Sequence, residues 1–220
     1  MRDTEMLSDS ITVSFVELPD GARHWPLVTD YLKLRKDVFL DEKCWPLQHH
    51  QGLEYEQYDT FDTVYVVACQ GDRLVGGGRL RRTDRTNGRG AVTYSYMIRD
   101  AWRGILPMLP AEICASEPPV ASDVWELTRL ATIGPPAVAI ALLTEVNRYL
   151  RERGARECLF LGSPAFVRMA KRLGWDPRCL GPVTGNEDGR FVAFSCPVLN
   201  DLDPVQAEPR GSVSAVRSAR

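Results

Sequence analysis

The residues best suited to chemistry lie in one short segment near the middle of the chain, residues 124–132, which read VWELTRLAT. Alternation along this segment predicts a β-strand that carries Glu126 and Thr128 on one side and Arg129 on the other. Its tryptophan, leucine, valine and alanine residues predict burial, and a buried charge is costly unless it is paired or used. Two interpretations follow. Glu126 and Arg129 form a structural ion pair at a strand edge, or Glu126 is a base and Arg129 binds an anionic or carbonyl group.

Other kinds of catalytic chemistry find little support in the sequence. The three histidines, His24, His49 and His50, lack the spacing of a metal site, and no metal centre is predicted. There is no G-x-S-x-G motif and no cysteine–histidine signature. No C-x-x-C motif occurs, so free, largely buried thiols are preferred over disulfides. The cysteines are Cys44, Cys69, Cys114, Cys158, Cys179 and Cys196.

Composition limits the class of protein. With 220 residues, 44% of them hydrophobic, the chain is long enough for one well-packed domain. A net charge of −2 argues against nucleic-acid binding. No apolar run approaches the roughly 20 residues that cross a bilayer, and Met1–Glu5 carries acids rather than an apolar core. We therefore expect a cytoplasmic protein without a membrane or nucleic-acid partner.

The candidate residues need a scaffold, and the hydrophobic pattern predicts alternating strands and helices. Together these elements predict an α/β (α+β) domain, a mixed sheet with helices on both faces, over residues 11–198. Residues 1–10 and 199–220 are predicted to be a flexible extension and a disordered tail. Strands are expected at residues 11–15, 63–69, 74–80, 124–132, 157–161 and 191–197, and helices at 26–40, 136–153 and 164–174, with a short helical or irregular segment at 97–108.

Two connecting segments need comment. Residues 41–62 have little periodicity but contain aromatic residues among acids, which is typical of an ordered functional loop. Gly76–Gly78 lacks the spacing of a phosphate-binding loop, so these glycines are interpreted as a bulge or a close backbone approach.

Four blocks in order give the chain a resemblance to a known family. Arg35 and Phe39, followed by Trp45, are similar to an R-x-x-x-F…W pattern. Residues 56–62 (EQYDTFD) are similar to an E-x-D-x-x-D block, Gly78-Arg79-Leu80 follows a predicted hairpin, and residues 125–129 (WELTR) are similar to an E-[ST]-x-R strand. Over roughly residues 11–198 the chain resembles the acyl-homoserine lactone (autoinducer) synthases of the LuxI type.

The resemblance implies a fold like that of the GCN5-related N-acetyltransferases. It also implies S-adenosylmethionine as amino donor and an acyl thioester, on acyl carrier protein or coenzyme A, as acyl donor, with no permanently bound cofactor. In the family's reaction the methionine amine attacks the thioester carbonyl. The methionine carboxylate then displaces methylthioadenosine and closes the lactone ring.

The same resemblance assigns roles to individual residues. Glu126 is expected to take a proton from the substrate amine, directly or through one water. Asp59 and Asp62 suit a substrate that is cationic at its sulfonium and ammonium groups, and Phe39 and Trp45 suit the adenosine or the sulfonium. Arg35, Arg79 and Arg129 are candidates either for binding the methionine carboxylate or for holding the acidic loop, residues 41–62, in place. The catalytic group is thus Glu126, Asp59 and Arg129, and the substrate-binding group is Arg35, Phe39, Trp45, Asp62, Arg79, Trp102, Thr128 and Ser163.

Several of these residues have simpler alternatives. Asp59 and Asp62 are also compatible with solvated loop acids, Trp45 and Trp102 with core aromatics, and Ser163 with a helix N-cap as well as with an acyl-tunnel site. The basic residues of the last two helices either solvate a face or bind an acidic carrier protein. These are Arg151, Arg153, Arg156, Arg168, Lys171 and Arg172.

Two other functions compete with lactone synthesis. An ordinary acetyl-coenzyme A N-acyltransferase of the same fold would use backbone N–H groups after the central strand to hold a pyrophosphate, and Pro135 and Pro136 remove such donors. A non-catalytic sensor would bind a ligand without turnover. Relative to the family the segment after Arg129 looks short and residues 82–97 look extended, so the acyl group is not readable from the sequence.

Overall fold

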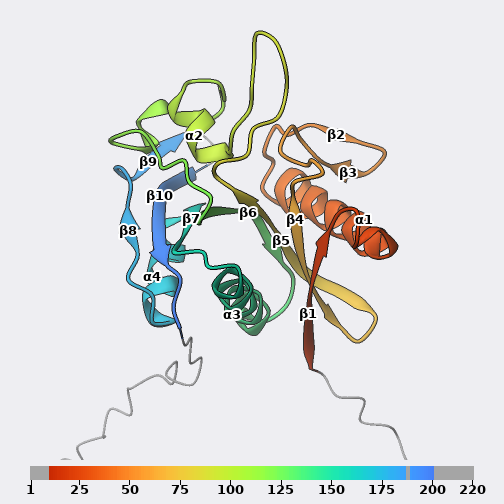
Figure 1. The fold of residues 1–220 in the computed structure, drawn as a ribbon. Coiled ribbons are helices and arrows are strands. Elements are labelled where there is room, and N and C mark those ends of the chain that lie inside the picture. Colours follow the sequence, from red (N-terminus) through yellow and green to blue (C-terminus); the bar gives the residue numbers. More distant parts are fainter. Residues whose placement is uncertain (1–9, 187–188, 201–220) are drawn as a thin grey trace, which may run out of the picture.

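The computed structural model describes residues 10–186 and 189–200, which form a mixed sheet between two layers of helices (Figure 1). The main sheet has the strand order β1-β4-β5-β6-β7-β10-β8, and β9 pairs with β10. Only the β6–β7 pair is parallel in the described sheet. The strands are β1 (Ile11–Glu17), β2 (His49–His50), β3 (Leu53–Glu54), β4 (Val64–Gln70), β5 (Arg73–Arg82), β6 (Val124–Thr132), β7 (Glu157–Gly162), β8 (Arg178–Cys179), β9 (Thr184–Asn186) and β10 (Gly189–Pro197).

Helices cover both faces of this sheet, as the sequence predicts (Figure 1). α3 and α4 pack on one face through the largest hydrophobic cluster, which includes Val66, Leu127 and Phe160. α1 packs on the other face against Tyr65 and Val67, and α2 lies beyond it over Val124. The helical elements are η1 (Ala22–His24), α1 (Trp25–Arg35), η2 (Lys36–Glu42), α2 (Met97–Trp102), η3 (Ala111–Ile113), α3 (Pro136–Glu152) and α4 (Pro164–Arg172).

The first helix differs from its prediction. Instead of one α-helix over residues 26–40, α1 ends at Arg35 and continues as the π-helix η2. The wider turn closes with Lys43 N–H donating to the carbonyl of Val38, five residues back. Apolar spacing does not distinguish the two helix types, because a π-helix adds only about one residue per turn. The following loop also contains a short β2–β3 hairpin that the sequence did not predict.

A β-bulge in β6 corrects the predicted alternation. Arg79 on β5 pairs with Thr128 and Gly77 pairs with Ala131, so residues 129 and 130 both lie opposite Gly78. Arg129 has a positive φ of 55°, which is uncommon for a residue with a side chain. The prediction that Arg129 points away from Glu126 is therefore wrong, because the extra residue turns Arg129 toward the side that carries Glu126 and Thr128.

The glycines of β5 allow close packing, as predicted, and do not form a phosphate loop. A Cβ atom on Gly77 would lie 2.5 Å from a ring carbon of Tyr31 on α1 and 2.9 Å from the carbonyl oxygen of Val66. The helix can therefore approach the sheet only because this position has no side chain. Gly76 meets Val138 of α3 in a similar way on the other face, at 3.0 Å.

Most of the predicted flexible ends, residues 1–9 and 201–220, lies outside the described residues. Leu199 is described, and its backbone exchanges two hydrogen bonds with the side chain of Asn147 on α3, at 2.8 and 3.0 Å. Within the described part of the chain, no helix has the length and apolar character to cross a membrane. All six cysteines are free, and three of them (Cys114, Cys158 and Cys196) are buried.

Candidate active site

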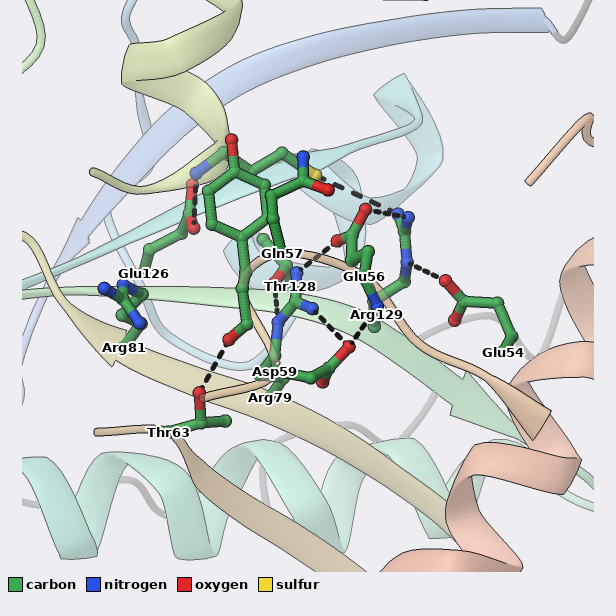
Figure 2. Close-up of polar contacts among 12 residues, drawn as sticks. Glu54, Glu56, Gln57, Asp59, Thr63, Arg79, Arg81, Glu126, Thr128 and Arg129 are labelled. Atoms are coloured by element: carbon green, nitrogen blue, oxygen red, sulfur yellow. Dashed lines mark hydrogen bonds and ion pairs between the residues drawn. The ribbon is translucent and has the colours of Figure 1, made fainter. Parts of the chain in front are cut away.

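Six charged side chains from α1, β3, β5, β6 and the loop that follows β3 meet in one cluster. Figure 2 labels all of them except the one from α1. The cluster balances three cations against three anions, so its formal charges cancel. It is largely withdrawn from solvent, and a buried charge cluster persists only when its members are paired and hydrogen-bonded. The cations are Arg35, Arg79 and Arg129, and the anions are Glu54, Glu56 and Asp59.

Asp59 is the most highly connected anion of this ion cluster. It accepts two hydrogen bonds from Arg35, at 2.8 and 3.1 Å, and lies 3.2 Å from Nη1 of Arg79. The backbone N–H of Glu56 and the hydroxyl of Tyr65 also donate to it, at 2.8 and 3.2 Å. Burial opposes its ionisation, but the charges of Arg79 and Arg35 hold the pKa of Asp59 well below its usual range. Asp59 is thus a fixed anion rather than a proton acceptor.

The guanidinium of Arg35 is fully engaged by the acidic loop. Its Nε donates to Glu54 while its two terminal nitrogens donate to Asp59. Of the two roles that the sequence leaves open for Arg35, this geometry favours holding the loop over binding a substrate carboxylate.

Arg79 and Arg129 hold Glu56 from two sides. Nη2 of Arg79 donates to Oε1 of Glu56 at 2.6 Å, and Nη2 of Arg129 donates to Oε2 at 2.9 Å. Burial raises the pKa of Glu56, but these two cations outweigh it and leave the pKa below its ordinary value. Nε of Arg79 also donates to the hydroxyl of Thr128, at 3.2 Å. Thr128 therefore orients Arg79 within the ion cluster.

Each of these arginines keeps some free donor capacity. Nη1 of Arg79 is buried and makes no hydrogen bond within the described structure, although it lies 3.2 Å from Asp59. In the described part of the chain, the one hydrogen-bond partner of Nη1 of Arg129 is the sulfur of Met97, at 3.9 Å. The side chains of Glu56 and Arg129 are 15% and 8% exposed, whereas those of Arg35 and Glu54 are at most 1% exposed. The ion cluster is therefore most accessible at Glu56 and Arg129.

Glu126 lies beside this cluster, on the same face of the sheet and 1% exposed. Its two oxygens accept hydrogen bonds from the backbone N–H groups of Met97 and Ile98 at the start of α2, at 3.0 and 2.8 Å. Burial raises the pKa of Glu126 to about 7, although these N–H groups and the charges of Arg79 and Arg81 oppose the shift. A carboxyl group with this pKa can accept and release a proton near neutrality.

Arg81 is another buried cation, and it lies directly across the β5–β6 ladder from Glu126. It has only neutral acceptors in the described structure: the carbonyl of Ser95 at 2.9 Å, and Thr60 and Asn87 side chains, each at 2.8 Å. Burial lowers the pKa of Arg81 from its ordinary value. Its charge favours the ionised form of Glu126, while the charges of Asp62 and Glu126 partly oppose the effect of burial on the pKa of Arg81.

Phe39 and Trp45 stack on each other at the edge of the ion cluster, with ring centroids 5.2 Å apart. The Cζ of Arg129 lies 5.7 Å from the Phe39 ring, and the Lys43 ammonium lies 5.2 and 5.0 Å from the two rings. Aromatic ring faces attract cations, so this pair can bind either the Lys43 ammonium of the loop or a positively charged group of a ligand.

Three predicted site residues lie apart from the ion cluster. Asp62 is exposed and borders a surface hollow of about 390 Å³ together with Phe61, Arg82 and Arg85. Trp102 packs on the hydrophobic cluster under α2. Ser163 is exposed at the N-cap position of α4, where its side chain makes no capping hydrogen bond.

The structure also reveals site residues that the sequence analysis missed. Glu54, Glu56 and Asp59 have the E-x-D-x-x-D spacing, with Glu56 in place of the first aspartate, two residues earlier than the block quoted from the sequence. With this shift, Glu54 rather than Asp62 is an acid of the site. The E-x-D-x-x-D spacing in the sequence could have revealed the role of Glu54. Arg81 and Asp100 had no sequence motif to mark them. Among the described residues no group of three or more His, Cys, Asp or Glu is placed to hold a metal ion.

Comparison with known proteins supports the family that the sequence motifs resemble. The family model described as autoinducer synthase matches residues 23–201. An acyl-homoserine-lactone synthase of Ralstonia solanacearum is 31% identical over 160 residues, covering 68% of this chain and 71% of the relative. One from Aeromonas salmonicida is 29% identical over 166 residues, covering 71% and 72%. An isovaleryl-homoserine lactone synthase of Bradyrhizobium diazoefficiens is 40% identical over 132 residues, covering 58% and 53%.

Solved structures share the fold. BjaI, a coenzyme A-dependent acyl-homoserine lactone synthase whose structure contains S-adenosylmethionine and isopentyl-CoA, superposes with a TM-score of 0.72 at 20% identity, covering 90% of this chain and 88% of BjaI. The synthase LasI gives 0.71 at 19% identity, covering 87% and 92%. An N-acetyltransferase from Lactobacillus plantarum gives 0.53 at 15% identity, covering 86% and 99%, so the predicted acetyltransferase-like fold is confirmed. The chain therefore belongs to the autoinducer synthase family, the acyltransferases that make acyl-homoserine lactones.

Proposed function

We propose that Glu126 is the general base of this synthase and that the neighbouring ion cluster binds the methionine part of its substrate. As a member of the family, the chain makes an acyl-homoserine lactone from S-adenosylmethionine and an acyl thioester. The observation that carries the proposal is the buried carboxyl of Glu126 with a pKa of about 7, next to a cluster of fixed charges. The substrate amine must lose a proton before it attacks, and this carboxylate accepts it directly or through one water.

The substrate's charges fit the accessible end of the ion cluster. Glu56 is the anion with the most exposed side chain, and it suits the ammonium or the sulfonium. Among the described residues, one terminal nitrogen of Arg129 has no anionic partner, and it suits the methionine carboxylate. Phe39 and Trp45 add an aromatic surface for the adenosine or the sulfonium. Asp59 and Arg35 then act by holding Glu56 and Arg79 in place.

The reaction follows from this arrangement in two steps. The neutral amine forms a bond to the thioester carbonyl carbon, the carbon–sulfur bond breaks, and the carrier leaves as a thiolate that takes up the proton lost by the nitrogen. The methionine carboxylate oxygen then attacks the γ-carbon and breaks its bond to sulfur, so that the lactone closes and methylthioadenosine leaves. The first step needs a proton acceptor, and the second needs a carboxylate held in a defined orientation.

The direct test is product formation by mass spectrometry. Purified protein is incubated with S-adenosylmethionine and a panel of acyl-coenzyme A and acyl-carrier-protein thioesters, with the Glu126→Gln variant alongside. An acyl-homoserine lactone together with methylthioadenosine is expected from the wild type, and the productive thioester identifies the acyl group. Acylation of an unrelated amine, or binding of S-adenosylmethionine without turnover, would contradict the proposal.

An acyl carrier protein, if it is the donor, is proposed to bind α4. Arg168, Lys171 and Arg172 are exposed on this helix, and none of them has an ion-pair partner within the described residues. Their spacing places them on neighbouring positions of one helix surface. Arg153 and Arg156, in contrast, already pair with Glu17 and Asp123. Unpaired cations on one surface attract an acidic partner and increase the rate of association.

Reversing two of these charges should therefore separate the two kinds of donor. In the Arg168→Glu/Lys171→Glu variant, kcat/KM with an acyl-carrier-protein thioester should fall by roughly 10-fold or more at low salt, while kcat/KM with the matching acyl-coenzyme A stays near the wild-type value. Arg148→Glu on α3 is the control, because Arg148 is already paired with Glu145 and Glu152. Equal losses with both donors would exclude α4 as a carrier-protein site.

We also propose that the protein works in the cytoplasm. The six cysteines form no disulfide, which suits a reducing compartment. Fractionation of cells that make the tagged protein tests this, and recovery in a membrane or extracellular fraction would contradict it.

A further inference from the structure

The start of α2 supplies both hydrogen-bond donors to Glu126, so the position of α2 determines the position of the base. α2 spans only six residues, Met97–Trp102, and so short a helix is not stable by itself. Contacts from elsewhere in the fold must therefore hold it against β6.

A buried carboxylate on α2 makes one set of these contacts. Asp100 is fully buried, and its Oδ2 accepts hydrogen bonds from the backbone N–H of Ser95 at 2.8 Å and from the hydroxyl of Tyr58 at 2.9 Å. Its Oδ1 accepts one from Arg103, at 3.0 Å. The Ser95 bond fixes the chain as it enters α2, and the Tyr58 bond connects α2 to a different segment, the acidic loop.

Tyr58 is itself rigidly placed. It lies between Glu56 and Asp59 in the sequence, so the ion cluster holds the backbone on both sides of it. Its ring packs below the Arg79 guanidinium, with the Cζ 5.4 Å from the ring centroid. Its carbonyl accepts a hydrogen bond from Thr63, at 2.6 Å. The hydroxyl of Tyr58 is thus a fixed donor directed at Asp100.

We propose that Tyr58 and Asp100 are positioning residues for lactone synthesis. Their hydrogen bond holds α2 against the acidic loop, and α2 in turn holds Glu126 beside the substrate bound at the ion cluster. This inference rests on the proposed function of Glu126 as base. It connects two parts of the site that other side chains also join: in the described structure Arg81 donates to Ser95 and Thr60, and Arg129 contacts the sulfur of Met97.

The ionisation of Glu126 provides a readout that a purely structural bond would not change. If α2 shifts, Glu126 loses N–H donors that favour its charged form, and its pKa rises further. The acid limb of the pH–rate profile should then move to higher pH. Other titratable or charged groups also surround Glu126: Arg79 and Arg81 on β5, Tyr58 in the acidic loop, Tyr96 before α2, Cys114 after η3 and Cys158 on β7. All of them except Tyr58 are chemically unchanged in Tyr58→Phe.

The test compares two tyrosine-to-phenylalanine variants in the lactone assay. In Tyr58→Phe, kcat should fall by roughly 10- to 100-fold with a smaller change in KM for S-adenosylmethionine. The acid limb of the pH–rate profile should move to higher pH by roughly 0.5–1 unit. Tyr149→Phe is the matched control, because Tyr149 also donates from a buried ring to a carboxylate, that of Glu17 at 2.8 Å, on the other face of the sheet. It should lower Tm without changing kcat or the acid limb.

A second pair of variants tests the same hydrogen bond from the side of Asp100, so that the conclusion does not depend on Tyr58→Phe alone. Asp100→Asn keeps an acceptor oxygen for Tyr58 and Ser95, so it should retain more activity than Asp100→Ala. Equal activity in these two variants, or wild-type kcat and acid limb in Tyr58→Phe, would overturn the inference. If Glu126→Gln itself keeps the wild-type rate and acid limb, the proposed role of Glu126 fails instead.

Discussion

Replacing Glu126 with glutamine should lower kcat for lactone synthesis by roughly 10²- to 10⁴-fold, which is the usual contribution of a general base. Glutamine has nearly the same shape but accepts no proton from the substrate amine. It also offers one acceptor oxygen where Glu126 offers two to Met97 and Ile98, so part of the loss will come from a weaker hold on α2. Steady-state kinetics with the productive thioester, at several pH values, measures both effects.

The pH dependence of kcat distinguishes the ionisation of Glu126 from that of the substrate amine. In the wild type, kcat should decrease as pH falls through about 7, because a protonated Glu126 cannot accept a proton. This limb should be absent from the residual activity of Glu126→Gln, whereas a limb due to the amine would persist. Glu157→Gln on the neighbouring strand β7 is the control and should behave as the wild type, since its side chain is partly exposed and only weakly paired. A variant with unchanged kcat and acid limb would rule out Glu126 as the base.

Stability gives an independent readout of the same ionisation. The folded pKa of Glu126, about 7, lies above its ordinary value of 4.5, so the folded state binds more protons than the unfolded state between these two values. The contribution of Glu126 is therefore most favourable below about pH 4.5 and is lost as pH rises through 7. Relative to Glu126→Gln, the unfolding free energy of the wild type should fall by on the order of 3 kcal/mol over this range.

Asp59→Asn should be the most destabilising conservative change in the ion cluster. The amide cannot balance Arg35 and Arg79, which leaves an uncompensated positive charge in a buried site. Removing one partner of a buried pair costs about 3–5 kcal/mol. Urea unfolding at pH 7 measures the loss, and lactone synthesis should fall with it because Glu56 loses its support.

The pH behaviour of Asp59 has the opposite sign to that of Glu126. Its pKa is depressed in the folded state, so its stabilisation is present above the ordinary aspartate pKa and is lost as pH falls below it. Asp59→Asn should therefore flatten the acid side of the stability profile. Asp30→Asn is the control, since Asp30 forms an exposed pair with Lys33 and should change stability by at most about 1 kcal/mol. Equal losses in the two variants would show that the ion cluster contributes no more than a surface pair.

The elements themselves could be predicted from the sequence because each depends on a local pattern. Alternation identified the strands β1 and β6, apolar runs between turns identified the other long strands, and helical spacing with Pro136 and Pro164 at first turns identified α3 and α4. The motif residues Arg35, Arg79, Glu126 and Arg129 converge as the family blocks imply. The block of acids was placed two residues late, because its sequence match did not distinguish Asp62 from Glu54.

By itself, the sequence determined the fold class through its periodicity and the family through its motif blocks, and it predicted several charged residues of the candidate site but not Glu54 or Glu56. Only the tertiary structure decided which acid pairs with which arginine and on which side of β6 Arg129 lies. The bulge that turns Arg129 is set by pairing with Gly77–Arg79, some fifty residues earlier in the chain. The bond from Tyr58 to Asp100 likewise joins segments 42 residues apart. Neither leaves a local pattern, because each arises from packing between distant elements rather than from the spacing within one.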